Sequence, residues 1–143
     1  MKEAYARDTK GKQTLNCYGV YKEDIALITN NYLFLVPEDK CYLKFETVFR
    51  KPPVRDVNKI LEGDFKPIED TNEITIKVKN GKQYRLHKFK LDNEYIYIND
   101  DYLKKFKCNS PKFEGIGPKS IVLVYEYGYL VGGILPLNIN YFD

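Results

Sequence analysis

The sequence predicts a β-dominated α+β domain, made of antiparallel sheets built from hairpins with one or two short helices. Aromatic residues make up 15% of the chain, with 13 tyrosines and no tryptophan, and aromatic and β-branched residues favour strands. Only two short segments have a helical pattern. Because 143 residues suffice for one hydrophobic core, we expect a single domain over 1–143. Its first half would be a meander over 15–49, and its second half hairpins and a helix over 73–139.

The most apolar stretch of the chain, 120–139, predicts a terminal hairpin with both faces largely buried. Ile121–Tyr125 would form the first arm and Leu130–Leu135 the second. Gly128 supplies the positive φ that a tight turn between them requires. The pair Gly132-Gly133 either kinks the second arm or lets another backbone approach closely.

The first half of the chain alternates apolar runs with turn residues. After a short helical segment at Met1–Arg7 we expect four strands, which the double proline at 52–53 then ends. A brief helical turn within Val54–Leu61, stopped by Gly63, and a loop over Phe65–Asn72 would follow. The four expected strands are Leu15–Tyr21, Ile25–Ile28, Tyr32–Val36 and Cys41–Phe49.

A second hairpin is expected over Glu73–Phe89, and its register depends on the length of its loop. A two-residue loop would place Ile76 opposite Arg85 and put the apolar sets of the two strands on opposite faces. A three-residue loop, Lys79–Gly81, pairs Ile76 with Tyr84 and keeps those sets together. The apolar pattern therefore favours the three-residue loop with a bulge at the glycine.

A short strand at Tyr95–Ile98 is expected to run directly into a helix over 99–107. Asn99 is a favourable N-cap, and two aspartates follow it in the first turn. Lysines crowd the last turn, where cations are favoured. Its buried stripe would consist of Tyr102, Leu103 and Phe106. A loop through Ser110-Pro111 and 115–118 would return the chain to the terminal hairpin.

The cysteines and the net charge give general indications of the cellular compartment and of the class of binding partner. Cys17, Cys41 and Cys108 are odd in number and scattered, which is typical of thiols in a reducing cytoplasm. We find no secretory signal and no apolar window long enough to cross a membrane, so we expect a cytoplasmic protein. A net charge of +3 is too small to indicate a nucleic-acid binder by itself.

Motifs for catalysis or for nucleotide binding are not found in the sequence. His87 is the single histidine, so a zinc site would need it together with all three dispersed cysteines. We interpret His87 as a strand residue beside a loop. The acidic pairs fall in turns or at a helix start. We therefore expect no catalytic site, no metal and no cofactor.

Basic residues are concentrated in two segments. Between 82 and 107 there are seven Lys or Arg against four acidic residues, and between 40 and 55 five against one. Such runs are usually solvated faces of a protein. Lysines at a helix end could instead neutralise phosphates without reading sequence.

In order, these segments resemble one domain of the bacterial DNA polymerase III β sliding clamp and its phage-borne relatives. The resemblance rests on four stretches: AYARDTKGKQTLNCYGVYKEDIALITNNYLFL, PPVRDVNKIL, IYINDDYLKKF and GGILPLNI. It covers nearly the whole chain as spacing and pattern. Asn30 stands where the family has an aspartate, and Asn31-Tyr32 where it has Gly-His.

The resemblance implies a non-enzymatic replication accessory domain that contacts duplex DNA independently of sequence. The helix from Asn99 to Lys107 would face DNA, with Lys104, Lys105 and Lys107 on phosphates and Arg7, Lys10 and Lys12 assisting. It also implies assembly into homo-oligomers and a pocket for polymerase-type peptide motifs. That pocket would be lined by Thr29, Tyr32, Val57, Leu135, Pro136 and Leu137.

A second interpretation remains open. The chain could be a clamp-fold protein-binding module or inhibitor, encoded by a phage or mobile element, that does not bind DNA. An enzyme is the third alternative. Ring assembly with Lys104 and Lys105 on the inner wall would favour the first interpretation.

Overall fold

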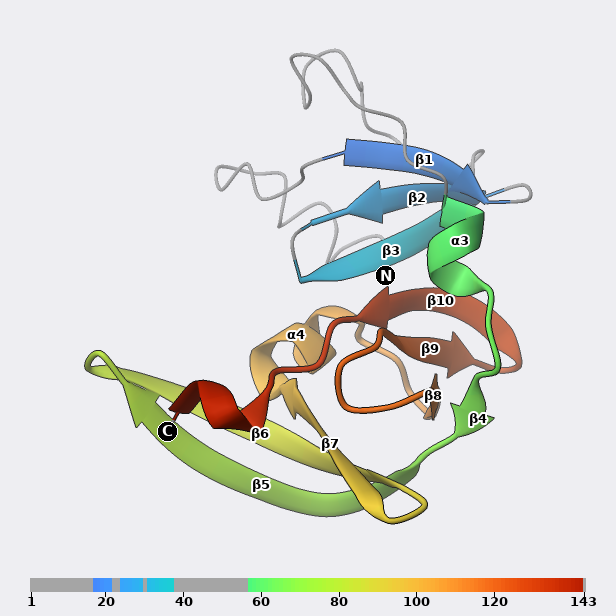
Figure 1. Cartoon of the computed structure of the whole chain (residues 1–143). Coiled ribbons are helices and arrows are strands. Elements are labelled where there is room, and N and C mark those ends of the chain that lie inside the picture. The colour runs from blue at the N-terminus through green and yellow to red at the C-terminus, as the bar shows by residue number, and fades with distance from the viewer. Residues whose placement is uncertain (1–16, 22–23, 30, 38–56, 143) are drawn as a thin grey trace.

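The computed structural model describes residues 17–21, 24–29, 31–37 and 57–142. Within these residues the protein consists mainly of antiparallel strands with two short α-helices, as the sequence predicts (Figure 1). The expected helix at Met1–Arg7 and the expected strand at Cys41–Phe49 lie outside the described residues.

The described elements follow the chain as a series of short strands interrupted by helical turns. The strands are β1 (Cys17–Tyr21), β2 (Asp24–Ile28), β3 (Tyr32–Pro37), β4 (Lys66–Pro67), β5 (Glu69–Lys79), β6 (Lys82–Leu91), β7 (Glu94–Asn99), β8 (Pro111–Gly115), β9 (Val122–Glu126) and β10 (Tyr129–Ile134). The helices are α3 (Val57–Leu61), α4 (Asp100–Lys105) and the 3₁₀-helix η2 (Ile139–Phe142).

Seven strands form the larger sheet, in the order β1-β2-β3-β10-β9-β8-β4. The predicted meander and the predicted terminal hairpin therefore meet edge to edge, where β3 pairs with β10 and Tyr32 lies opposite Ile134. The terminal hairpin turns at Tyr127 and Gly128, which have φ angles of 52° and 81°. Both values belong to the left-handed region that a two-residue hairpin turn needs, so this prediction is confirmed.

Gly132 lies opposite Phe34 in the pairing of β10 with β3. A Cβ atom at this position would lie 2.6 Å from Cε1 of Phe106 and closer still to the carbonyl oxygen of Leu33. The pairing of β10 with β9 also changes register between Leu130 and Gly132. Of the two alternatives for this glycine pair, close approach of a neighbouring backbone is therefore the one observed at Gly132.

The smaller sheet has three strands in the order β5-β6-β7. The β5–β6 turn contains two residues, Asn80 and Gly81, with φ angles of 53° and 76°. Ile76 consequently pairs with Arg85. The predicted three-residue loop and bulge are therefore wrong, and the apolar residues of β5 and β6 do lie on opposite faces.

The structure tolerates this register because both faces of the smaller sheet are used. Tyr84 belongs to the face that η2 covers, where its ring centroid is 5.3 Å from that of Phe142. The chain reaches this position along β7, since the N–H of Leu137 donates to the carbonyl of Tyr97 at 2.8 Å. Phe89, on the other face, packs against the larger sheet in the main core.

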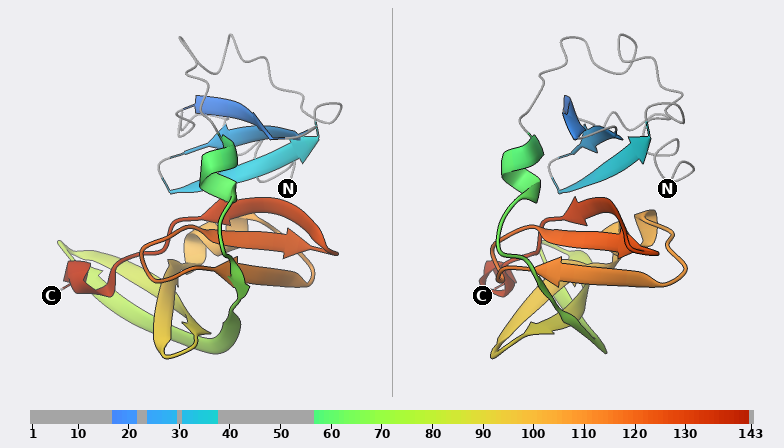
Figure 2. Two further views of the ribbon diagram at one scale, coloured as in Figure 1. Left: turned by 45° about the vertical axis from the view of Figure 1, so that its right-hand side comes forward. Right: turned by 90° about the vertical axis from the view of Figure 1, so that its right-hand side faces the viewer.

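The hydrophobic core has two parts, one on each face of the larger sheet. Figure 2 shows the elements that surround them, with α3 beside β2 and β3 and the smaller sheet farther from α3. The main core lies between the larger sheet, the smaller sheet and the end of α4, and includes the fully buried Phe34, Phe89 and Ile96. The second core lies beneath α3, whose Val57 and Leu61 contact alternate residues of β2 and β3. Side chains of β3 alternate between the two cores, because successive residues of a strand point to opposite faces.

Two expected loops contain strands. The expected loop over Phe65–Asn72 contains β4 and the start of β5, and the loop after Ser110 contains β8. The predicted helical turn before Gly63 is confirmed as α3.

Candidate functional site

The helix α4 begins where the sequence predicts, but it ends two residues before the expected Lys107. The side chain of Asn99 accepts the N–H of Asp101 at 3.0 Å, which confirms the predicted N-cap. Asp100 and Asp101 occupy the first turn, where carboxylates are favoured. The N–H of Phe106 donates to the carbonyl of Leu103. The helix therefore stops at Lys105, and Lys107 leaves it with a φ of 46°.

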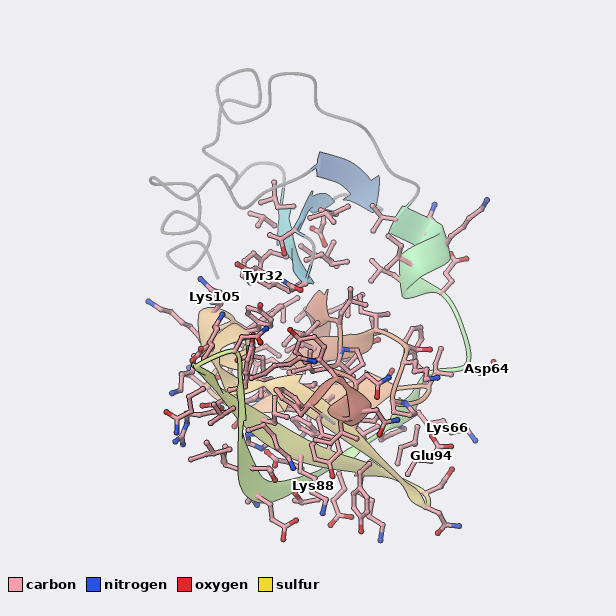
Figure 3. The ribbon with its side chains drawn as sticks, turned by 60° about the vertical axis from the view of Figure 1, so that its left-hand side comes forward. Tyr32, Asp64, Lys66, Lys88, Glu94 and Lys105 are labelled. Atoms are coloured by element: carbon pink, nitrogen blue, oxygen red, sulfur yellow. The ribbon has the colours of Figure 1, made fainter. Side chains whose placement is uncertain are left out.

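Three lysines thus surround the C-terminal end of α4. The Nζ of Lys104 lies 3.1 Å from Oδ2 of Asp100, and its side chain is 68% exposed. The Nζ of Lys105 lies 5.9 Å from the ring centroid of Tyr32, and Figure 3 shows the two residues side by side. Lys107 is exposed beyond the helix. Arg7, Lys10 and Lys12, which the resemblance adds to this set, lie outside the described residues.

A pocket of about 250 Å³ opens beside these lysines. Its inner surface is apolar, whereas its polar lining includes both carboxylates and cations. The lining residues are Asp70, His87, Phe89, Asp100, Leu103, Lys104, Phe106, Lys107, Cys108, Pro111, Phe113 and Val124.

His87 lies between two carboxylates in this pocket. Its Nε2 is 2.6 Å from Oδ1 of Asp70, and its Nδ1 is 3.7 Å from Oδ1 of Asp100. The ring also stacks on Phe89, with 4.8 Å between centroids. His87 is a strand residue, as predicted, but the sequence reasoning missed both aspartates, which belong to β5 and α4.

Asp100 is the central anion of this group. Its side chain is 12% exposed and faces Lys104, His87 and Arg85, whose Nε lies 3.9 Å from Oδ2. Because the cations Lys104 and Arg85 both face this carboxylate, its charge is locally compensated. Asp100 therefore offsets part of the positive charge at this end of α4.

The thiol in the pocket is held in its protonated form. Burial, followed by a hydrogen bond with Glu126, raises the pKa of Cys108 to about 12. Its Sγ donates to the carbonyl of Phe106 at 3.4 Å. A thiol must lose its proton to act as a nucleophile, so the pocket does not supply an activated cysteine.

The predicted peptide-site residues are distributed over two faces of the larger sheet. Tyr32 is buried in the main core, whereas Val57 is buried in the second core beneath α3. Residues 32 and 134 pair across β3 and β10, and the N–H of Leu135 donates to the carbonyl of Asn31 at 2.8 Å. The structure thus brings Thr29, Tyr32 and Leu135 together, but it separates Val57 from them.

Thr29 has a structural role in the turn between β2 and β3. Its Oγ1 donates to the carbonyl of Tyr32 at 3.0 Å. The same oxygen accepts the N–H groups of Asn31 at 3.1 Å and of Tyr32 at 3.0 Å. Directly after β10, which pairs with β3, Leu135 is 46% exposed, and Pro136 and Leu137 are half-buried. Of the six residues predicted for the peptide site, these three are the ones with exposed apolar surface in the part of the chain that the structure describes.

Among the described residues, no group of three or more His, Cys, Asp or Glu side chains is arranged to hold a metal ion. None of the helices in that part of the chain has the length and apolar character needed to cross a membrane. Comparison with family models, with curated proteins and with solved structures found no match.

Proposed function

We propose that this chain is a non-enzymatic, clamp-like binding domain that contacts duplex DNA through the lysines at the end of α4. The observation that carries the proposal is the convergence of Lys104, Lys105 and Lys107 on one end of a short helix. The helix packs against the main core through Tyr102 and Leu103, whereas Asp101 and Lys104 on its polar side are exposed.

The chemistry of these side chains favours phosphate over base contacts. A lysine ammonium is a compact point charge with three donors on a flexible stem, and it binds phosphate without geometric selectivity. Contacts to phosphates position a duplex but carry no sequence information. Lys104 already faces Asp100, so part of its charge is compensated before a duplex binds.

The test is the salt dependence of duplex binding by the triple variant Lys104→Ala, Lys105→Ala, Lys107→Ala. Each phosphate neutralised adds about −0.9 to the slope of log K against log salt concentration. We therefore expect the triple variant to flatten the slope by about 1.8 to 2.7, and to weaken binding equally for unrelated sequences.

A matched control removes three exposed lysines elsewhere: Lys59→Ala, Lys66→Ala and Lys119→Ala. Figure 3 shows Lys66 on the opposite side of the molecule from Lys105. The control lowers the net charge by the same amount as the triple variant but keeps the lysines of α4. It should therefore leave most of the salt-dependence slope intact. The proposal is wrong if parent and triple variant bind alike, or if the parent binds no duplex at low salt.

The second candidate function is protein binding without DNA, and a separate observation favours it. The strand β5 carries three exposed apolar side chains, Ile74, Ile76 and Val78, which are 38%, 49% and 63% exposed. Contiguous exposed apolar residues on a sheet edge are typical of protein-binding surfaces. A parent chain that binds a protein partner at β5 but binds no duplex DNA would favour this candidate.

The accompanying peptide site and homo-oligomer are part of the same proposal. A peptide partner would meet Leu135, Pro136 and Leu137, beside the junction of β3 and β10. Substituting Leu135→Ser should weaken capture of a polymerase-type peptide without altering duplex binding, because Leu135 is exposed and lies outside the α4 lysines.

A further inference from the structure

The three-stranded sheet leaves one long strand edge open. Within the part of the chain that the structure describes, β5 pairs only with β6. Its pairing with β6 is regular from Glu73 to Lys79, and the one irregularity in the pairing lies before this segment, between Asp70 and Glu73. Figure 1 shows this strand along the outer border of the molecule. An open edge of this kind is a template for another strand.

The hairpin geometry determines which backbone groups face outward. In a two-residue hairpin the residues that flank the turn, here Lys79 and Lys82, form a hydrogen-bonded pair. Pairs alternate along an antiparallel ladder, so the next such residues of β5 are Lys77 and Thr75. The alternate residues of β5 are Ile74, Ile76 and Val78. Their backbone N–H and C=O groups therefore point away from β6.

The same three residues carry the exposed apolar side chains. A partner strand would thus find backbone hydrogen-bonding groups and apolar surface at identical positions. Their side chains share one face of the sheet, because they are two residues apart. The opposite face is the one that η2 partly covers near Tyr84. A strand added here would extend both the ladder and the apolar stripe.

The regular segment Glu73–Lys79 is complementary to itself. It has seven residues with Ile76 at its centre. An antiparallel copy related by a two-fold axis at Ile76 pairs Ile76 with Ile76, and Ile74 with Val78. The same register places Glu73 opposite Lys79 on the other face. The acidic and basic ends of the segment therefore match in this orientation, whereas a parallel copy would place like charges side by side.

Glu73 and Lys79 are able to make this contact. The Oε2 of Glu73 is 3.4 Å from Nζ of Lys88, and the side chain of Glu73 is 64% exposed. The Nζ of Lys79 donates to the carbonyl of Tyr141. An ammonium has three donors, so Lys79 can keep this bond and also donate to a carboxylate.

We propose that β5 is a dimerisation edge, at which two copies of this chain pair antiparallel about Ile76 to form a continuous six-stranded sheet. The contact is isologous, and such a contact closes after two subunits. It is separate from the α4 lysines, so it does not depend on the proposed DNA contact. The short apolar stripe makes it a weak dimer that forms as concentration rises.

Sedimentation equilibrium over a range of concentrations tests the dimer. We expect a reversible monomer–dimer equilibrium for the parent chain. The variant Ile76→Lys places like charges opposite each other at the two-fold axis and should weaken association about tenfold or more. The matched control Ile116→Lys changes a residue that is 46% exposed, against 49% for Ile76, and should leave association unchanged.

Charge reversal provides a test that does not alter the apolar stripe. Either Glu73→Lys or Lys79→Glu alone should weaken the dimer severalfold, whereas the double variant should restore it, because the reversed charges again meet across the axis. Circular dichroism of each variant verifies the fold. In hydrogen exchange, the amides of Ile74, Ile76 and Val78 should become protected only at concentrations where the dimer forms.

Several results would overturn the proposal. A parent chain that stays monomeric at its highest attainable concentration refutes it. So does a dimer that Ile76→Lys leaves intact, or a double variant in which the two reversals simply add. A parent that is monomeric but captures an unrelated β-strand peptide at this edge would show strand addition by a different partner, which also refutes self-pairing.

Discussion

Gly132 provides the sharpest test of how the two halves of the larger sheet are joined. Replacing it by alanine adds one methyl group between β10 and β3. The added Cβ would lie 2.6 Å from Cε1 of Phe106 and closer still to the carbonyl oxygen of Leu33. Ordinary van der Waals contact begins at 3.4 Å, so both neighbours must give way, Phe106 by about 0.8 Å and the Leu33 oxygen by more.

Neither neighbour can move easily. The oxygen of Leu33 belongs to the backbone of a central strand, and Phe106 is 2% exposed with its ring 4.7 Å from that of Phe34. Overpacking of a core typically costs about 1 to 3 kcal/mol. Because both obstacles are fixed, we expect Gly132→Ala to lower the free energy of unfolding by about 3 kcal/mol.

Chemical denaturation at equilibrium measures this change, with Gly81→Ala as the matched control. Gly81 has a φ of 76° and no atom within 4 Å of its hypothetical Cβ, so that substitution reports only the cost of a left-handed alanine, about 1 kcal/mol. Gly132 has a φ of 158°, so the excess cost of its variant over Gly81→Ala reports the steric clash together with the strain of that backbone conformation. If Gly132→Ala destabilises the protein no more than Gly81→Ala does, the close approach of β10 to β3 is wrong.

Two further expectations concern Thr29 and Cys108. Thr29→Val leaves the N–H groups of Asn31 and Tyr32 without the Oγ1 that now accepts them. In a denaturation experiment it should lower the free energy of unfolding by about 1 to 3 kcal/mol, whereas Thr29→Ser keeps the oxygen and should lower it less. Since the pKa of Cys108 is raised to about 12, its thiolate fraction at pH 8 is about a thousandfold lower than in the unfolded chain. Alkylation followed by peptide mapping should therefore label it slower by up to about that factor. The raised pKa also means that the unfolded thiol loses its proton first, so its contribution to stability falls as pH rises from about 9 to about 12. Glu126→Gln should speed the labelling, because Glu126 contributes to the shift; equal labelling rates in native and denatured protein would contradict the buried thiol.

The sequence predicted elements whose signals are local. The turn at Tyr127-Gly128 follows from one glycine between two apolar arms, and the start of α4 follows from Asn99 and the two aspartates after it. The two strands that the sequence did not predict, the edge strand β4 and its neighbour β8, lack an apolar pattern of their own. Pro67 and Pro111 both lie within them. They are strands because they pair with neighbours, which local propensity does not report.

The register of the β5–β6 hairpin could not be derived from its own residues. The expected three-residue loop assumed that Ile76 and Tyr84 must share a single core. The ring of Phe142, far along the chain, instead packs against Tyr84 on the other face. The arrangement around His87 was hidden for the same reason, since Asp70 and Asp100 reach it from separate elements. Both omissions concern contacts between distant parts of the chain.

The pairing of β3 with β10 has a consequence for the order in which the protein can form during synthesis. Leu33 pairs with Gly133, about a hundred residues later. Until β10 has left the ribosome, the meander therefore has no strand at its β3 edge, and the apolar side chains of Phe34 and Ile134 cannot meet in the main core. Such long-range closure slows folding and leaves a strand edge exposed to aggregation. The nascent chain should thus depend on holdase chaperones until β10 emerges, and synonymous codons that slow translation between residues 57 and 129 would lengthen that vulnerable interval.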